Sequence, residues 1–92
     1  MEQINLEGHI LGGYAIPTAN TTILLIKAPH GFLGCGYSLA TAEKVGDAAV
    51  IVSGVENFEE MLAAKVKGFS PAAAALGVTL EMSGKQALLK LI

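Results

Sequence analysis

The chain has 92 residues, of which 52% are hydrophobic and only 15% charged, and its formal net charge is −2. It contains no arginine, so it lacks the basic face that holds a nucleic-acid backbone. Its longest apolar runs, 23–26 and 48–52, are far shorter than the ~20 residues of a membrane-spanning helix, and a single cysteine excludes an intrachain disulfide.

The N-terminal part of the chain has the signals of β-structure. Strands are predicted over residues 3–7, 10–16, 22–28 and 32–37, joined as an antiparallel meander. Glu7-Gly8 is typical of a tight hairpin turn, Gly12-Gly13 indicates a bulge or a close backbone approach, and Pro17 ends its strand. The strand over 22–28 is apolar on both faces apart from Lys27, which predicts a central strand covered on both sides.

After Ser38 the helix signals become more frequent. Helices are predicted over residues 38–45, 55–66, 70–76 and 83–91, and short strands over 48–52 and 78–81. Ser70-Pro71 combines an N-cap with proline at the first helical position, and Ser83 with Gln86 forms a capping-box pattern. Residues 1–92 are therefore predicted to form one α+β domain, in which the meander joins a helix-rich C-terminal half with one or two further short strands.

The apolar surplus predicts self-association. A chain of 9.5 kDa buries about 63% of its surface on folding, which leaves little interior for a composition with a mean hydropathy of +0.55. The predicted helices are enough to cover one face of the sheet, and few charges between Gly8 and Lys27 would solvate the other face. Because a contiguous apolar surface normally marks an interface, we expect a symmetric homo-oligomer.

Cys35 is the foremost candidate for chemistry, because glycines flank it on both sides and leave the local backbone open to a ligand. The alternative is a core cysteine, which is favoured because Leu33, Cys35 and Tyr37 point to one face and no basic residue adjoins the thiol. His30 is a second candidate, but it lies in a turn and about 16 Å of extended strand separates it from Cys35.

Ligand sites have weaker signals. The glycines around Cys35 (Gly34 and Gly36) and the predicted helix start Ser83-Gly84-Lys85 are candidate ligand-binding positions, the latter for a small anion. The capping box alone accounts for Ser83, and neither segment matches a nucleotide-binding motif. His9, His30 and Cys35 lack the spacing of a zinc site, so no metal is expected.

Two segments carry a resemblance to a known family: His30-Gly31-Phe32-x-x-Cys35-Gly36, and Met82-Ser83-Gly84-Lys85-Gln86-Ala87-Leu88-Leu89-Lys90-Leu91. From Leu6-Glu7-Gly8 to its C-terminus the chain is similar to the YunC-like family, small bacterial and archaeal proteins classed as a domain of unknown function. The resemblance implies an N-terminal β-sheet region that tetramerises. It implies no activity, so Cys35-Gly36 and Ser83-Gly84 are motif positions without a catalytic role.

Two classes of function follow from these observations. The first is a homo-oligomeric structural or small-ligand-binding module, a tetramer whose partner is a further copy of itself. The second is a thiol-dependent enzyme or sulfur carrier that uses Cys35. No cofactor, nucleic acid or membrane is expected, and the absence of a leader-like N-terminus together with the single cysteine predicts a cytoplasmic protein.

Overall fold

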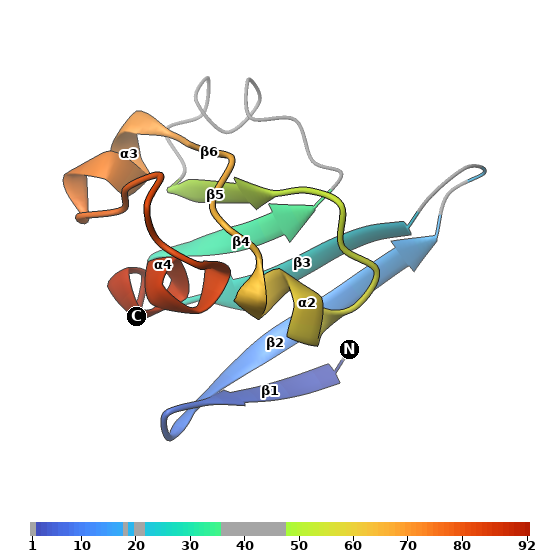
Figure 1. Cartoon of the computed structure of the whole chain (residues 1–92). Coiled ribbons are helices and arrows are strands. Elements are labelled where there is room, and N and C mark those ends of the chain that lie inside the picture. Colours follow the sequence, from blue (N-terminus) through green and yellow to red (C-terminus); the bar gives the residue numbers. More distant parts are fainter. Residues whose placement is uncertain (1, 18, 20–21, 36–47) are drawn as a thin grey trace.

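A six-stranded sheet forms the centre of the computed structural model, which describes residues 2–17, 19, 22–35 and 48–92. The strands follow chain order across the sheet: β1 (Glu2–Leu6), β2 (His9–Pro17), β3 (Thr22–Ala28), β4 (Gly31–Cys35), β5 (Ala49–Val52) and β6 (Gly68–Phe69). The first four strands pair antiparallel, β5 lies parallel to β4, and β6 is antiparallel to β5 (Figure 1). The sheet is therefore mixed.

The helical part is smaller than predicted. The described helices are α2 (Phe58–Ala63), α3 (Pro71–Ala75) and α4 (Gly84–Lys90), with six, five and seven residues. The expectation of a helix-rich C-terminal half is wrong, because β5 and β6 extend the sheet and connecting segments occupy much of the rest. The helix predicted over 38–45 and the end of the strand predicted over 32–37 lie outside the described residues.

The helix predicted over 55–66 illustrates why apolar spacing misled. Asn57 caps α2 by accepting a hydrogen bond from the Glu60 backbone, and the chain leaves the helix at Ala64 to bridge Lys65 with Ser83. Val66 is nevertheless buried, although its backbone is not helical. The spacing of the apolar residues indicated which side chains face the core. An extended segment can bury such side chains as well as a helix can.

The predicted tight turn between β1 and β2 is present, whereas the turn predicted between β2 and β3 lies largely outside the described residues. Glu7 and Gly8 have φ angles of 51° and 89°, and the Asn5 side chain accepts a hydrogen bond from the Gly8 backbone at 3.0 Å. Gly13 keeps regular register opposite Ile26, so there is no bulge there. A Cβ atom at Gly13 would lie 2.7 Å from the Ile4 Cδ1 atom, which makes this glycine a site of close packing.

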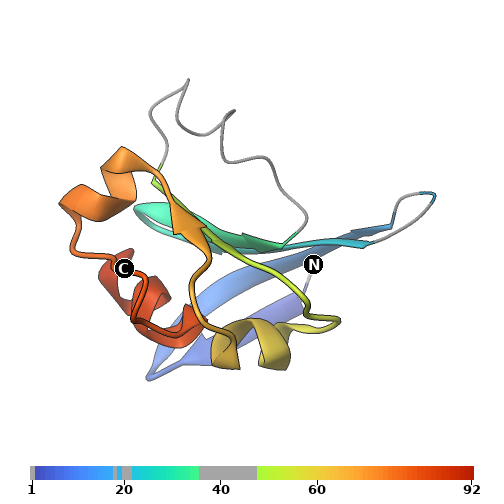
Figure 2. The same cartoon turned by 45° about the horizontal axis from the view of Figure 1, so that its top comes forward.

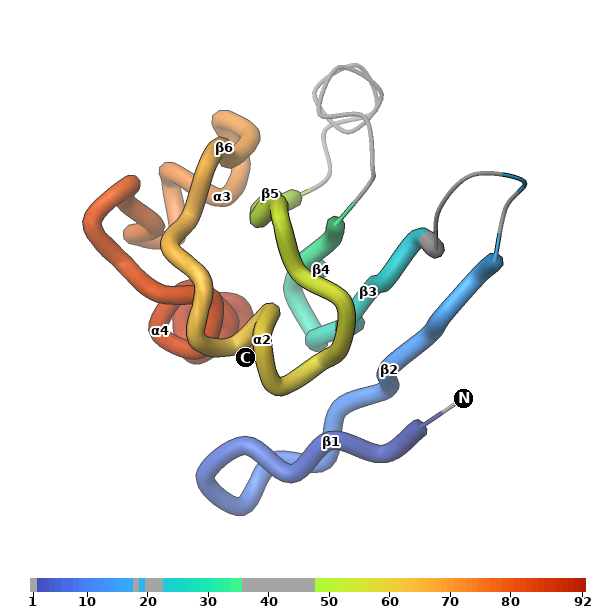
Figure 3. Tube along the Cα trace, turned by 45° about the vertical axis from the view of Figure 1, so that its right-hand side comes forward, coloured from blue at the N-terminus to red at the C-terminus, as the bar shows by residue number. Residues whose placement is uncertain are grey.

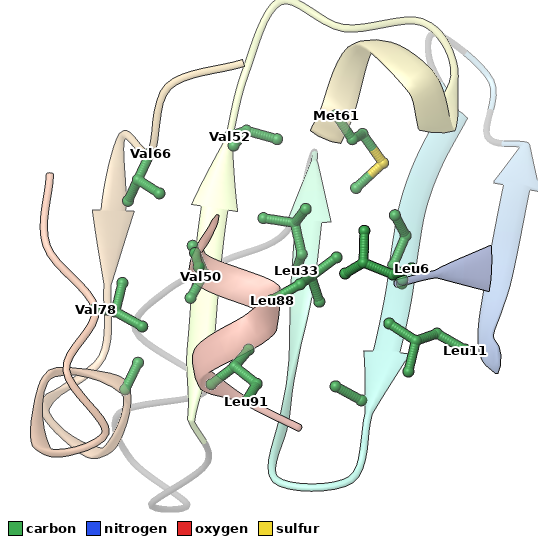
Figure 4. Close-up of a cluster of buried hydrophobic side chains, with 14 of the residues drawn as sticks. Leu6, Leu11, Leu33, Val50, Val52, Met61, Val66, Val78, Leu88 and Leu91 are labelled. Carbon is green, nitrogen blue, oxygen red and sulfur yellow. The ribbon is translucent and has the colours of Figure 1, made fainter. Parts of the chain in front are cut away.

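Helices α2 and α4 lie on the same side of the sheet and contact each other, whereas α3 lies near its β6 edge (Figure 2). The core forms between these two helices and the strands (Figure 4). Its largest fully buried apolar side chains are Ile26, Leu33, Met61, Leu88, Leu91, Val50 and Val52. Among the described residues, no helix has both the length and the apolar character needed to cross a membrane.

Candidate functional site

The opposite side of β2 and β3 carries an apolar surface that we call the open face. It consists of Ile10, Gly12, Tyr14, Ile16, Ile23, Leu25 and Lys27, which share one side of the sheet by strand alternation and register. Ile10, Tyr14 and Ile16 are 60%, 37% and 54% exposed. The sequence had predicted a central strand covered on both sides, but within one chain only the Leu24–Ile26–Ala28 side of β3 is buried.

One end of β2 and β3 extends beyond the neighbouring strands. The described pairing of β1 with β2 stops at Gly13, and that of β4 with β3 stops at Leu24. Among the described residues, Ile16 and Ile23 pair with each other and with no third strand. We call this end of β2 and β3 the arm, and it projects from the rest of the molecule (Figures 1 and 3).

Two shallow hollows meet on the open face at Lys27. The first, of about 380 Å³, is lined by Gln3, Ile10 and Tyr14 together with Lys27. The second, of about 450 Å³, has Leu25, His30 and Phe32 along its walls, again with Lys27. Lys27 is exposed, and it is the only charged residue among the described members of the open face. The sequence singled out Lys27 merely as an exception to an apolar strand.

Cys35 faces the helices, away from the open face. It lies opposite Leu24 on β3 and Val52 on β5, and its side chain is half-buried. Its thiol donates a hydrogen bond to the Val55 carbonyl oxygen at 4.0 Å. The structure thus places this thiol against the core, where packing accounts for a small apolar side chain.

His30 and Cys35 lie at opposite ends of β4, so the structure does not bring these two candidates together. His30 is exposed in the turn between β3 and β4, as predicted. Its backbone N–H donates to the Leu91 carbonyl oxygen at 2.8 Å, which ties this turn to the end of α4.

Gly31 and Gly84, one glycine from each family motif, occupy close contacts, whereas Gly36 lies outside the described residues. A Cβ atom at Gly31 would collide with the Ala48 carbonyl oxygen, and one at Gly84 would collide with the Met61 carbonyl oxygen. Gly84 lets the start of α4 approach the end of α2, and its backbone N–H donates to the Ala64 carbonyl oxygen at 2.8 Å. These two motif positions are explained by backbone packing.

The start of α4 satisfies its own donors. The capping box is complete: the Gln86 backbone donates to the Ser83 hydroxyl, and the Ser83 backbone donates to the Gln86 side chain. With Gly84 also engaged, little remains there to hold an anion, and Lys85 is exposed beside it. In the described part of the chain, no three His, Cys, Asp or Glu residues come close enough together to hold a metal ion.

Comparisons with known proteins agree with the resemblance noted from the motifs. The Bacillus subtilis (strain 168) "Uncharacterized protein YunC" is 28% identical over 95 residues, which span 97% of this chain and 93% of that protein. A solved structure is also similar: the crystal structure of a protein of unknown function, TA1206 from Thermoplasma acidophilum. The two sequences are 32% identical, and the structures superimpose with a TM-score of 0.92 over 99% of this chain and 90% of the other. The resemblance to the YunC-like family is confirmed.

A family profile described as "Domain of unknown function (DUF1805)" matches residues 34–91, which include Cys35 and the whole of α4. The match covers more than half of the chain. The protein therefore belongs to this family, a domain of unknown function.

Proposed function

We propose that the protein is a homo-oligomeric module, assembled as a tetramer, in which the open face forms the contact between copies. The observation that carries the proposal is the exposure of Ile10, Tyr14 and Ile16 in a row on β2. These three side chains share one face of the strand, with Gly12 between Ile10 and Tyr14, and the exposure of apolar side chains gathered on one face is unfavourable.

The shape of the open face suits a second copy of the same chain. An antiparallel pair of strands can pack against its own copy across a two-fold axis, and both copies then bury the same residues. The arm extends the open face, because Ile16 and Ile23 continue its apolar surface beyond the described pairings of β1 and β4. The tetramerising N-terminal sheet implied by the family resemblance supports four copies over two.

Within this proposal the chain is a structural or small-ligand-binding protein of the cytoplasm. Its single cysteine is free and half-buried against the core, which suits a reducing compartment and a packing role. The hollows beside Lys27 are the feature that suits a small ligand.

Sedimentation velocity at micromolar concentration tests the assembly. We expect a single species of four chains, whose thermal midpoint rises with protein concentration because association stabilises the folded chain. A well-folded species of one chain under these conditions would refute the proposal.

A matched pair of variants tests the surface. Ile16 and Leu80 are 54% and 56% exposed, but Ile16 lies on the arm and Leu80 lies between α3 and α4. Ile16→Lys should shift the sedimentation profile to smaller species, because it places a charge in the contact. Leu80→Lys should leave the tetramer unchanged; equal behaviour of the two variants would contradict the assigned surface.

A further inference from the structure

A contact between copies made by the open face would bury the positive charge of Lys27. Among the described residues of this apolar surface it is the one cation, and it lies opposite Gly12 on β2 and Phe32 on β4. No described carboxylate is a member of the open face: Glu2 pairs with Gly13, whose side of the sheet faces the helices, Glu7 lies in the turn after β1, and the glutamates of α2 are on the helix side. A copy of the same face would therefore bring Lys27 more apolar surface and a second lysine.

Burying an ammonium without a counter-ion is strongly unfavourable, so a contact that covers Lys27 favours a bound anion beside it. We propose that the hollows that meet at Lys27 bind a small organic carboxylate, with its carboxylate on the Lys27 ammonium and its apolar body against the wall formed by Leu25 and Phe32. The inference rests on the proposed assembly in one respect, the burial of Lys27 by a second copy. The hollows themselves are formed within one chain.

The walls favour a carboxylate over a phosphate. Phosphate sites generally combine several donors, such as an arginine fork or successive backbone N–H groups, whereas a lysine supplies a compact point charge. Here a single lysine lines the larger hollow, with His30 as a further polar residue of its lining, and Leu25, Phe32 and Pro29 supply carbon. Volumes of about 380 and 450 Å³ fall in the range of pockets that hold small molecules.

Binding can be measured on the intact protein by isothermal titration calorimetry with sodium benzoate and sodium hexanoate at fixed ionic strength. Benzamide, hexanamide and inorganic phosphate serve as matched probes. We expect saturable binding of at least one carboxylate and a raised thermal midpoint, with the neutral amides and phosphate much weaker. No saturable carboxylate binding, equal binding of the amides, or tighter binding of phosphate would each overturn the inference.

Four substitutions locate the site. Lys27→Met keeps the alkyl stem and removes the charge, so carboxylate affinity should fall about tenfold or more, whereas Lys27→Arg should retain it. Lys67→Met, at an exposed lysine outside the hollows, should bind as the unchanged protein does. Retained binding in Lys27→Met would overturn the inference, as would loss of binding in Lys85→Met, which would move the anion to the start of α4.

Sedimentation of the same samples separates this inference from the proposed assembly. A tetramer that binds no carboxylate would contradict the carboxylate site alone. A single chain that binds benzoate through Lys27 would support the site and refute the assembly. In carboxylate-free buffer, Lys27→Met should associate at least as tightly as the unchanged protein, because it no longer buries an unpaired charge; weaker association would count against the inference.

Discussion

Leu24 and Leu25 follow each other on β3 and face opposite sides of the sheet. Leu24 lies opposite Ala15 and Cys35 and is 4% exposed, whereas Leu25 lies opposite Tyr14 and Gly34 on the open face. Two adjacent, chemically identical side chains therefore belong to two different surfaces, the core of one chain and the proposed contact between chains.

The same substitution at these two positions should have different consequences. Leu24→Asp places a charge in the core and should prevent folding even at high protein concentration. Leu25→Asp should disrupt the assembly while the chain keeps its own core, yielding smaller or aggregated species with native-like secondary structure. Far-UV circular dichroism and sedimentation velocity distinguish the outcomes, and a folded tetramer of Leu25→Asp would contradict the proposed contact.

Cys35 should behave as a packing residue. Cys35→Ala should lower the free energy of unfolding by about 1 kcal/mol with the assembly intact, because it removes one half-buried sulfur atom. Cys35→Asp should be much more destabilising, because it places a charge against Leu24 and Val52. Urea unfolding at fixed protein concentration measures both, and an unchanged midpoint for Cys35→Asp would show that the thiol is open to solvent.

Native thiol titration gives an independent test of the same residue. A small electrophile near neutral pH should modify Cys35 much more slowly in the folded protein than in urea, since the side chain is half-buried and hydrogen-bonded to Val55. Equal rates in both states would favour the thiol-dependent function that the sequence left open.

Ser70 and Ser83 both cap helices, but their loss should not cost the same. Ser83→Ala should lower stability by about 1 kcal/mol, because it removes the N-cap of α4. Ser70 is 1% exposed, and its hydroxyl accepts a hydrogen bond from the Ala49 backbone at 2.9 Å as well as capping α3. Ser70→Ala also leaves a buried donor on β5 unsatisfied, so we expect a loss of about 2–3 kcal/mol.

Thermal unfolding of the two serine variants and of Ser53→Ala, an exposed control, gives the ranking directly. Ser53→Ala should be close to neutral. A Ser70 variant as stable as the Ser83 variant would mean that the Ala49 hydrogen bond contributes nothing.

Gly84→Ala should destabilise the protein although alanine is the better helix former. The new methyl group would collide with the Met61 carbonyl oxygen and lie 3.0 Å from the Leu33 Cδ2 atom, so α4 would have to move away from α2. We expect a loss of about 3 kcal/mol, at the upper end for overpacking. Lys85 is exposed one residue further along the same helix, so Lys85→Ala should change the free energy of unfolding by no more than about 0.5 kcal/mol. A Gly84→Ala protein with the same thermal midpoint as Lys85→Ala would disprove the close contact.

The turns and helix caps could be predicted because each depends on a few residues that are close together in the sequence. Glu7-Gly8 meets the positive φ requirement of a short hairpin, and Ser83 with Gln86 satisfies the first donors of α4 within one turn. The order of the first four strands followed from their short connections, which favour antiparallel neighbours. The candidate thiol was likewise placed correctly on the Leu33 face of β4.

The sequence by itself determined the alternation of side chains along the N-terminal strands, the tight turn at Glu7-Gly8 and the residues at which α3 and α4 begin. Only the tertiary structure decided that β5 lies parallel to β4, that α2 ends at Ala63 and that Gly68–Phe69 forms β6, since each depends on partners distant in the chain. It also decided that Lys27 stands between two hollows. Strand alternation places Lys27 on one face of the sheet, but the shape of the hollows around it comes from β1, β2 and β4 together. The apolar pattern of a strand has the same period whether a helix, a loop or another copy of the chain covers that face.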